Sequence, residues 1–176
     1  MVRLPSLFRR LAALAFRLSP TSRLRRALLR RALFSAWASF DRRDFEVNLI
    51  FFAPDAEFEF PSGMQTLGLD DSFPGHQGRI EALNKIFEVW GATEFEPAYI
   101  LDLGDRVLPL GFFRAQASAS GVPLEQEFAQ LGTVRDGLIV RDQTFFSWEE
   151  ALRAAGLDPD AIALSAHGKT SQAASL

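Results

Sequence analysis

Few side chains in this sequence could transfer a proton near neutral pH. Two histidines (His76 and His167) and one tyrosine (Tyr99) accompany 22 aspartates and glutamates, so acid–base chemistry would rest on a carboxylate whose pKa is raised by its surroundings. Cysteine is absent, which excludes thiol nucleophiles, disulfides and thiolate metal sites. The sequence has no Gly-x-Ser-x-Gly turn and no phosphate-binding glycine loop. We therefore expect no metal and no cofactor.

Hydrophobic spacing predicts the elements that would position these groups. Helices are expected at residues 23–40, 45–52, 79–90 and 149–155, and strands at 56–60, 97–103, 106–118, 123–135 and 138–148. Asp136-Gly137 predicts a two-residue hairpin, because both central positions of that turn favour positive φ. Three helices followed by a meander of antiparallel strands indicate an α+β fold. We assign one domain to residues 22–157, between an extension (1–21) and a tail (158–176) expected to be disordered.

The N-terminal extension differs in charge from the rest of the chain. The net charge is −3, but residues 1–31 hold nine of the 19 basic residues and no acid. Leucines at helical spacing from Leu4 to Leu18 predict a basic amphipathic helix that ends before Pro20. Residues 1–20 could contact a membrane surface or a partner, serve as an organelle transit segment, pack on the domain, or be upstream sequence from a misplaced start codon. A single short helix favours the last two interpretations.

Several short motifs stand at the joints between the predicted elements. They are SAWASFDRRD (35–44), FAPDA (52–56), GHQGRI (75–80), LGDRV (103–107), SGV (120–122), VRDGLIVR (134–141) and EALRAAGL (150–157). In this order and spacing they resemble the nuclear transport factor 2-like superfamily, most closely its SnoaL-like branch, over residues 28 to 157. The resemblance implies a cone-shaped, curved antiparallel sheet wrapped around three N-terminal helices. It also implies an apolar pocket at the open end of the cone and dimerisation through the sheet.

Positions where related enzymes keep their catalytic groups hold other residues here. The carboxylate base of ketosteroid isomerases would fall at Phe60, their oxyanion-hole tyrosine at about Ala36 and their protonated aspartate at about Ala129. The Arg-x-Asp and aspartate of limonene-type epoxide hydrolases would fall at 111–113 and Thr144. Neither a phenyl ring nor a methyl group can move a proton or stabilise an enolate. Both mechanisms are therefore disfavoured.

The same alignment indicates which strand residues face the cone, because side chains alternate between faces. Asp142 is the inward carboxylate that we expect to be catalytic, opposite Leu131 and with a pKa raised by apolar neighbours. The alternative is that Asp142 pairs with Arg106 or Arg114 near the rim. His76 is expected at the pocket rim, although a solvated loop position would also suit it. The remaining predicted pocket residues are Trp37, Phe58, Phe60, Phe87, Trp90, Tyr99, Phe113, Glu127, Ala129, Thr144 and Phe146, of which Phe87 could equally fill the core.

Two features of the strands bear on orientation and assembly. Tyr99 and Asp102 have opposite parity on one strand, so one of them should point inward. On the outward face, Gln126, Phe128 and Gln130 should lie beside Arg141, Gln143 and Phe145. A mixed polar surface with a Phe128–Phe145 pair would suit a homodimer.

Two functions follow. The first is a SnoaL-like small-molecule pocket protein, an isomerase, cyclase or hydrolase acting on a hydrophobic substrate. The second is a non-catalytic ligand-binding or dimerisation module. The expected partners are a hydrophobic small molecule and a second copy of the chain. Nucleic acid is not expected, because the domain is acidic and the arginines lack interleaved stacking aromatics. A cytoplasmic location is expected, since no apolar run is long enough for a membrane span or placed as a secretory signal.

Overall fold

The computed structural model describes residues 10, 13–61, 64, 72–117 and 120–160. Six strands form one sheet in the order β2-β1-β6-β5-β4-β3, antiparallel except for the parallel pair β1–β6. The strands are β1 (Phe52–Glu59), β2 (Ser72–Pro74), β3 (Trp90–Asp102), β4 (Arg106–Ala117), β5 (Pro123–Arg135) and β6 (Leu138–Phe145). The helices are α2 (Arg23–Asp41), α3 (Phe45–Leu49), α4 (Gly75–Val89) and α5 (Trp148–Ala154).

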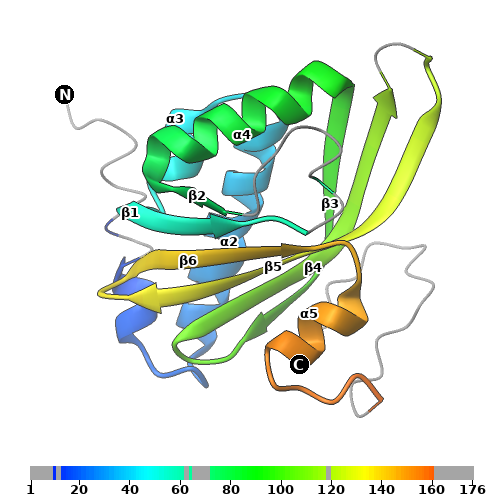
Figure 1. Cartoon of the computed structure of the whole chain (residues 1–176). Helices are drawn as coiled ribbons and strands as arrows, with labels where there is room; N and C mark the ends of the chain where they lie inside the picture. The colour runs from blue at the N-terminus through cyan, green and yellow to red at the C-terminus, as the bar shows by residue number, and fades with distance from the viewer. Residues whose placement is uncertain (1–9, 11–12, 62–63, 65–71, 118–119, 161–176) are drawn as a thin grey trace.

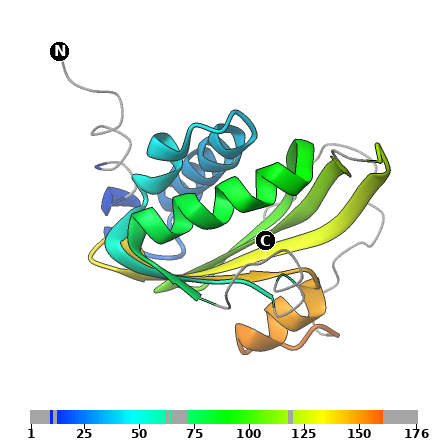
Figure 2. The same ribbon diagram turned by 45° about the horizontal axis from the view of Figure 1, so that its top comes forward.

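The curved sheet separates two layers of helices. Helices α2, α3 and α4 lie over its inner face, and α5 packs on its outer face (Figures 1 and 2). The larger core lies between the inner face and the first three helices, whereas a smaller core joins Leu108, Leu110 and Leu131 to Trp148 and Leu152 of α5. The predicted α+β architecture, a curved sheet around three helices, is confirmed.

Local sequence explains where most elements begin and end. The side chains of Ser22, Asp44 and Ser147 accept hydrogen bonds from the first turns of α2, α3 and α5, as helix caps do. Asp136 and Gly137 both have positive φ (52° and 79°), which confirms the predicted hairpin turn. Three elements start at least four residues earlier than predicted. One is β1, which begins at Phe52, so the helix predicted at 45–52 ends at Leu49. Helix α4 begins directly after Pro74, and β3 begins at Trp90 because its pairing with β4 extends that far.

A bulge in the β5–β6 hairpin changes which side chains face the cone. Val134 pairs with Ile139, but Thr133 pairs with Arg141, so Val140 is an extra residue on β6. A one-residue shift moves every later side chain of the partner strand to the other face. Asp142 therefore lies opposite Gly132 rather than Leu131.

Three predictions fail because of this shift. Glu127 and Ala129, which were expected in the pocket, lie on the outer face of the sheet. Ala129 belongs to the core under α5, and the Glu127 carboxylate accepts a hydrogen bond from the Trp148 backbone N–H (2.9 Å). The outward Phe128–Phe145 pair is also wrong, since Phe128 belongs to the inner core and Phe145 packs against the outer one. The Phe128–Phe145 pair therefore cannot form the centre of the predicted dimer surface.

A second irregularity, between Pro97 and Tyr99 on β3, settles which residue of that strand points inward. Tyr99 faces the outer core, with its ring centroid 5.9 Å from that of Trp148, so its predicted place in the pocket is wrong. Asp102 instead faces α2, where it binds Arg25.

A buried arginine ties the N-terminal segment to the domain. The Arg25 side chain donates to both carboxylate oxygens of Asp102 (2.7 Å each) and to the backbone carbonyl of Gly104. It also donates to the carbonyl oxygens of Phe16 (3.3 Å) and Leu18 (2.9 Å), at the end of the helical residues 13–17. These contacts favour the interpretation of this segment as a helix packed on the domain.

Other predictions about the chain ends concern residues 1–9 and 161–176, which lie outside the described residues. In the part that is described, none of the helices combines the length and the apolar character needed to cross a bilayer.

Removing the counter-charge of Arg25 should destabilise the fold. Asp102→Asn leaves a buried guanidinium without its carboxylate, so we expect the free energy of unfolding to fall by about 3 kcal/mol, measured by urea denaturation. Arg23→Gln changes an exposed arginine of the same helix and should cost less than about 0.5 kcal/mol. Equal losses in the two variants would contradict this role of Arg25.

Candidate functional site

A cavity of about 220 Å³ lies between the inner face of the sheet and helices α2 and α4. Its walls are mainly aromatic and aliphatic side chains, namely Phe40, Phe60, Met64, Leu83, Ile86, Trp90, Phe95, Phe113, Leu124, Phe128 and Phe146. Four polar side chains reach it, those of Arg79, Gln126, Gln130 and Thr144. A dry cavity of about 150 Å³ accepts benzene, so this one has room for a somewhat larger ring compound.

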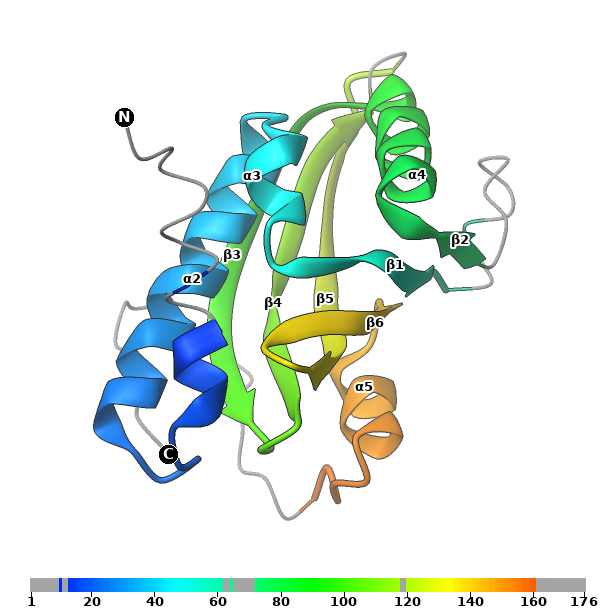
Figure 3. The same ribbon diagram turned by 90° about the vertical axis from the view of Figure 1, so that its left-hand side faces the viewer.

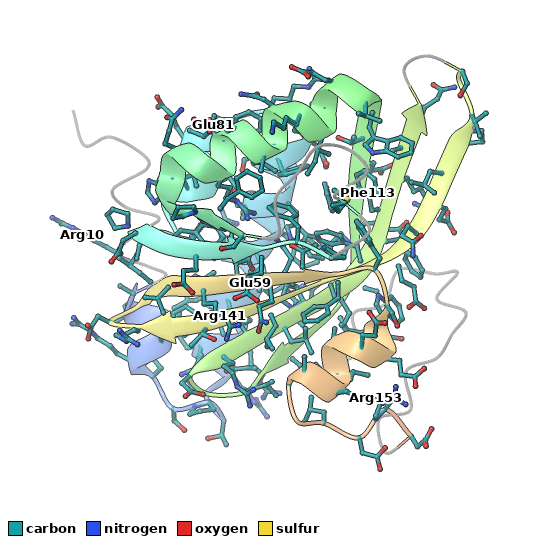
Figure 4. All side chains as sticks on the ribbon, in the orientation of Figure 1. Arg10, Glu59, Glu81, Phe113, Arg141 and Arg153 are labelled. Carbon is teal, nitrogen blue, oxygen red and sulfur yellow. The ribbon has the colours of Figure 1, made fainter. Side chains whose placement is uncertain are left out.

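The aromatic wall is organised around Phe95 of β3. Its ring centroid lies 4.5 Å from that of Phe40, 4.6 Å from Phe128 and 5.0 Å from Phe113. The contacts with Phe40 and Phe128 are edge-to-face, the geometry that the ring quadrupoles favour. Figure 4 shows Phe113 between α4 and the sheet. Rings from a helix and three strands therefore hold one another in place around the cavity.

A buried polar cluster adjoins these rings. Arg79 of α4 and Asp142 of β6 are each 3% exposed, and Arg79 Nη1 donates to Asp142 Oδ2 (3.0 Å). Gln130 Nε2 donates to the same oxygen (3.0 Å), while Gln130 Oε1 accepts a hydrogen bond from Trp37 Nε1 (3.1 Å). Arg79 Nε donates to Asn48 Oδ1 (3.4 Å). Within the described part of the chain, every buried side-chain nitrogen or oxygen has a hydrogen-bond partner.

The electrostatics of the cluster reflect its burial. Desolvation raises the pKa of Asp142, and the Arg79 guanidinium and Gln130 amide that bind the carboxylate oppose that rise. Burial likewise lowers the pKa of Arg79, against the attraction of Asp142, but a guanidinium stays protonated in proteins. Its charge lies over the rings of Phe58 (4.5 Å to the centroid) and Phe52 (4.8 Å). Stacked rings partly replace the lost water around the cation.

The charge pair separates the main cavity from a smaller one of about 40 Å³. Arg79 and Gln130 border both cavities, whereas Asp142 borders only the smaller one, together with Trp37, Asn48 and other residues. Of these two charged residues, only Arg79 lines the main cavity. In the described residues, no three carboxylate or histidine side chains gather closely enough to hold a metal ion.

The structure places the predicted site residues in several different positions. Those that line the main cavity are Phe60, Trp90, Phe113, Thr144 and Phe146. Trp37 borders the smaller cavity, while Phe58 and Phe87 are buried in the core away from both linings. His76, expected at the rim, borders neither cavity, and its Nε2 lies 3.2 Å from the Phe52 carbonyl oxygen.

The arginine expected beside Asp142 is a different one. Arg106 donates to the Ala155 carbonyl oxygen (3.1 Å), and Arg114 pairs with Glu96 and Glu125 at the surface. The true partner, Arg79, comes from α4. Helical spacing in the sequence could have indicated that Arg79 faces inward, because residues 79, 83 and 86 share one face of the helix. All three residues line the cavity.

Comparisons with known proteins agree on the fold. The family model described as a SnoaL-like domain matches residues 31–142. The crystal structure of TerC, co-crystallized with polyporic acid, is 30% identical, covers 72% of this chain and 95% of TerC, and has a TM-score of 0.61. No curated protein matches the chain in sequence.

Two further structures share the fold. An NTF2-like protein of unknown function from Burkholderia pseudomallei K96243 is 24% identical, with a TM-score of 0.62 over 70% of this chain and 93% of its own. IdmH from Streptomyces antibioticus, a candidate polyketide cyclase, is 22% identical, with a TM-score of 0.56 over 72% of this chain and 97% of its own. At these identities the likeness concerns the fold alone.

Breaking the buried pair should cost far more than breaking an exposed pair on the same strand. Asp142→Asn leaves the Arg79 charge buried without a counter-ion, so we expect a loss of about 3 kcal/mol in the free energy of unfolding. Arg141→Gln removes the neighbouring Arg141–Glu59 pair (Figure 4), whose side chains are 47% and 29% exposed; this should cost less than about 1 kcal/mol.

A double variant separates charge burial from packing. Arg79→Met with Asp142→Leu removes both charges and should recover most of the stability that Asp142→Asn loses. Urea denaturation of the four proteins measures this. A loss in Asp142→Asn no larger than in Arg141→Gln would contradict the assignment.

Proposed function

The chain belongs to the SnoaL-like family, and we propose that its domain binds a hydrophobic, ring-bearing small molecule with an acidic or carbonyl oxygen that Arg79 binds. One observation carries the proposal: among the described residues, Arg79 is the one charged residue that lines a cavity whose walls are otherwise mostly aromatic and aliphatic. Small-molecule sites commonly combine an apolar lining with a few polar groups that fix orientation.

The identity of the charged residue on the cavity wall favours a ligand with an oxygen acceptor. Arg79 borders the main cavity and Asp142 does not, so a ligand there meets the cation and not the carboxylate. Thr144 supplies a hydroxyl, and Gln126 and Gln130 each keep one amide hydrogen beyond those donated to the Phe146 carbonyl oxygen (2.8 Å) and to Asp142. TerC was co-crystallized with polyporic acid, and an acid as ligand agrees with this proposal.

Binding, rather than proton transfer, is the function that the cavity favours. Isomerisation, cyclisation and hydrolysis, the reactions implied by the resemblance, require a proton donor or acceptor. Among the described residues that line the main cavity there is no carboxylate, histidine, lysine or tyrosine. We propose that Arg79 binds and polarises the ligand oxygen and that Asp142 orients Arg79.

Proton transfer by Asp142 is the second candidate function. It is favoured by the inward orientation of Asp142 and by the burial that raises its pKa, the two features of a tuned general acid or base. Exchange of the α-protons of 2-tetralone in D2O, followed by NMR, tests it. Exchange that the wild type accelerates and Asp142→Asn abolishes would favour this candidate, whereas no acceleration would favour binding alone.

Two other expectations stay predictions, namely a homodimer formed through the sheet and a cytoplasmic location. Sedimentation velocity of the full chain tests the first.

The role of Arg79 predicts a preference between two ligands of similar shape. We expect the wild type to bind 2-naphthoate at least about tenfold more tightly than 2-ethylnaphthalene, the scale of one hydrogen bond to a charged group. Arg79→Gln with Asp142→Asn keeps polar side chains at both positions and removes both charges. It should abolish the preference and retain the affinity for 2-ethylnaphthalene. Isothermal titration calorimetry measures both constants.

Paired tryptophan substitutions test the location. Leu124 lines the cavity, whereas Val122 on the same segment is 60% exposed. Leu124→Trp should fill the cavity and abolish binding of both probes, and Val122→Trp should leave binding unchanged. Binding to Leu124→Trp with wild-type affinity would contradict a site in this cavity.

A further inference from the structure

The outer side of the N-terminal helices is rich in arginine. Helix α2 and the helical segment before it expose six arginines, namely Arg10, Arg17, Arg23, Arg26, Arg30 and Arg31. The first acid in the sequence is Asp41, so residues 1–40 contain no negative side chain. We call these six residues, with the apolar residues described next, the arginine face.

Large apolar side chains lie exposed among these arginines. Leu14 is 47% exposed, Leu24 56% and Phe34 37%, and they are three of the five exposed large hydrophobic residues of the described chain. The Arg30 guanidinium carbon lies 5.4 Å from the centroid of the Phe34 ring. Exposed apolar side chains surrounded by charged ones are typical of an interaction surface.

Helical geometry places most of these residues on the side away from the sheet. In α2 the buried residues Arg25, Leu29, Ala36, Ser39 and Phe40 share one side, and buried Trp37 lies next to it. Residues 23, 24, 31 and 34 fall on the remaining arc at 100° per residue, whereas Arg26 and Arg30 fall on either side of the direction of Trp37 and are exposed. Residues 10, 14 and 17 follow helical spacing and are all exposed. Figure 3 shows this segment beside the first turns of α2, and the contacts of Arg25 fix the two together.

The rest of the chain has the opposite charge. The sequence after residue 31 contains ten basic residues and all 22 acidic ones. A negatively charged surface would therefore attract the arginine face and repel the remainder of the domain, which gives the molecule a defined orientation. Figure 4 shows Arg10 projecting from the edge of the molecule.

We propose that the arginine face binds the surface of an anionic lipid membrane. Its arginines would contact the lipid phosphates, and Leu14, Leu24 and Phe34 would enter the headgroup region, where apolar side chains add to electrostatic attraction. Exposed aliphatic side chains within the face favour lipid over nucleic acid, whose phosphates and bases bind arginine together with polar and stacking groups. This proposal is independent of the ligand proposed for the cavity.

Co-sedimentation of the full chain with vesicles tests the proposal. Vesicles of phosphatidylcholine alone are compared with vesicles containing about one third phosphatidylglycerol, at low and high salt. We expect binding to the anionic vesicles alone, weakened by salt. Each arginine near such a surface is worth about fivefold in affinity. Replacing Arg23, Arg26, Arg30 and Arg31 by glutamine should therefore lower binding by about a hundredfold or more.

A matched variant controls for total charge. Replacing Arg42, Arg135, Arg141 and Arg153, all exposed and elsewhere on the domain, by glutamine removes the same four charges and should change binding less than about fivefold. Thermal unfolding checks that both variants fold. A third variant, Leu14→Ser with Leu24→Ser, should weaken vesicle binding at unchanged charge. Equal binding to neutral and anionic vesicles, equal losses in the two arginine variants, or binding to an RNA oligonucleotide with none to vesicles would each overturn the proposal.

Discussion

The ion pair between Arg79 and Asp142 holds the inner layer of this domain together. It joins helix α4 to strand β6 across 63 residues of sequence, at the level where the parallel pairing of β1 and β6 sets Phe58 beside Asp142. Because both charged groups are buried, each needs partners that replace the lost water. Asp142 accepts a hydrogen bond from Gln130, and Arg79 donates one to Asn48 and lies over the rings of Phe52 and Phe58. The pair also lies between the two cavities, and of its two residues only Arg79 lines the larger one. Packing, electrostatics and the proposed binding function thus depend on one contact.

Local rules of sequence predicted most of the fold. Alternation, helix caps and the Asp136-Gly137 turn located the helices and the long strands, since each depends on a few adjacent residues. The failures occur where backbone irregularities intervene. The extra residue Val140 in β6 has no side-chain signature, and Pro97 at the irregularity in β3 permits a bulge without requiring one, yet each irregularity moves residues to the opposite face. Glu127 and Ala129 were misplaced for this reason, and the choice between Tyr99 and Asp102 as the inward residue of β3 stayed open.

The site was predictable only in part. Part of its aromatic wall (Phe60, Trp90, Phe113 and Phe146) was predicted and Asp142 was correctly expected to face inward, but Phe95 was not predicted and Phe128 was expected on the outer face. Arg79 was missed as the partner because the contact spans two elements that are distant in the chain. Pattern alone also could not separate the arginines of the N-terminal region, where Arg25 is buried against Asp102 and its neighbours Arg23 and Arg26 are exposed. One helix thus serves the core on one side and carries an exposed cationic surface on the other.

The central claim is that a ring-bearing ligand binds in the main cavity with its oxygen at Arg79. A crystal structure of the full chain with 2-naphthoate tests it most directly. We predict the naphthalene rings between Phe95, Phe113 and Phe128, with the carboxylate within hydrogen-bonding distance of Arg79. Naphthoate bound with its carboxylate directed away from Arg79, or bound outside this cavity, would contradict the account.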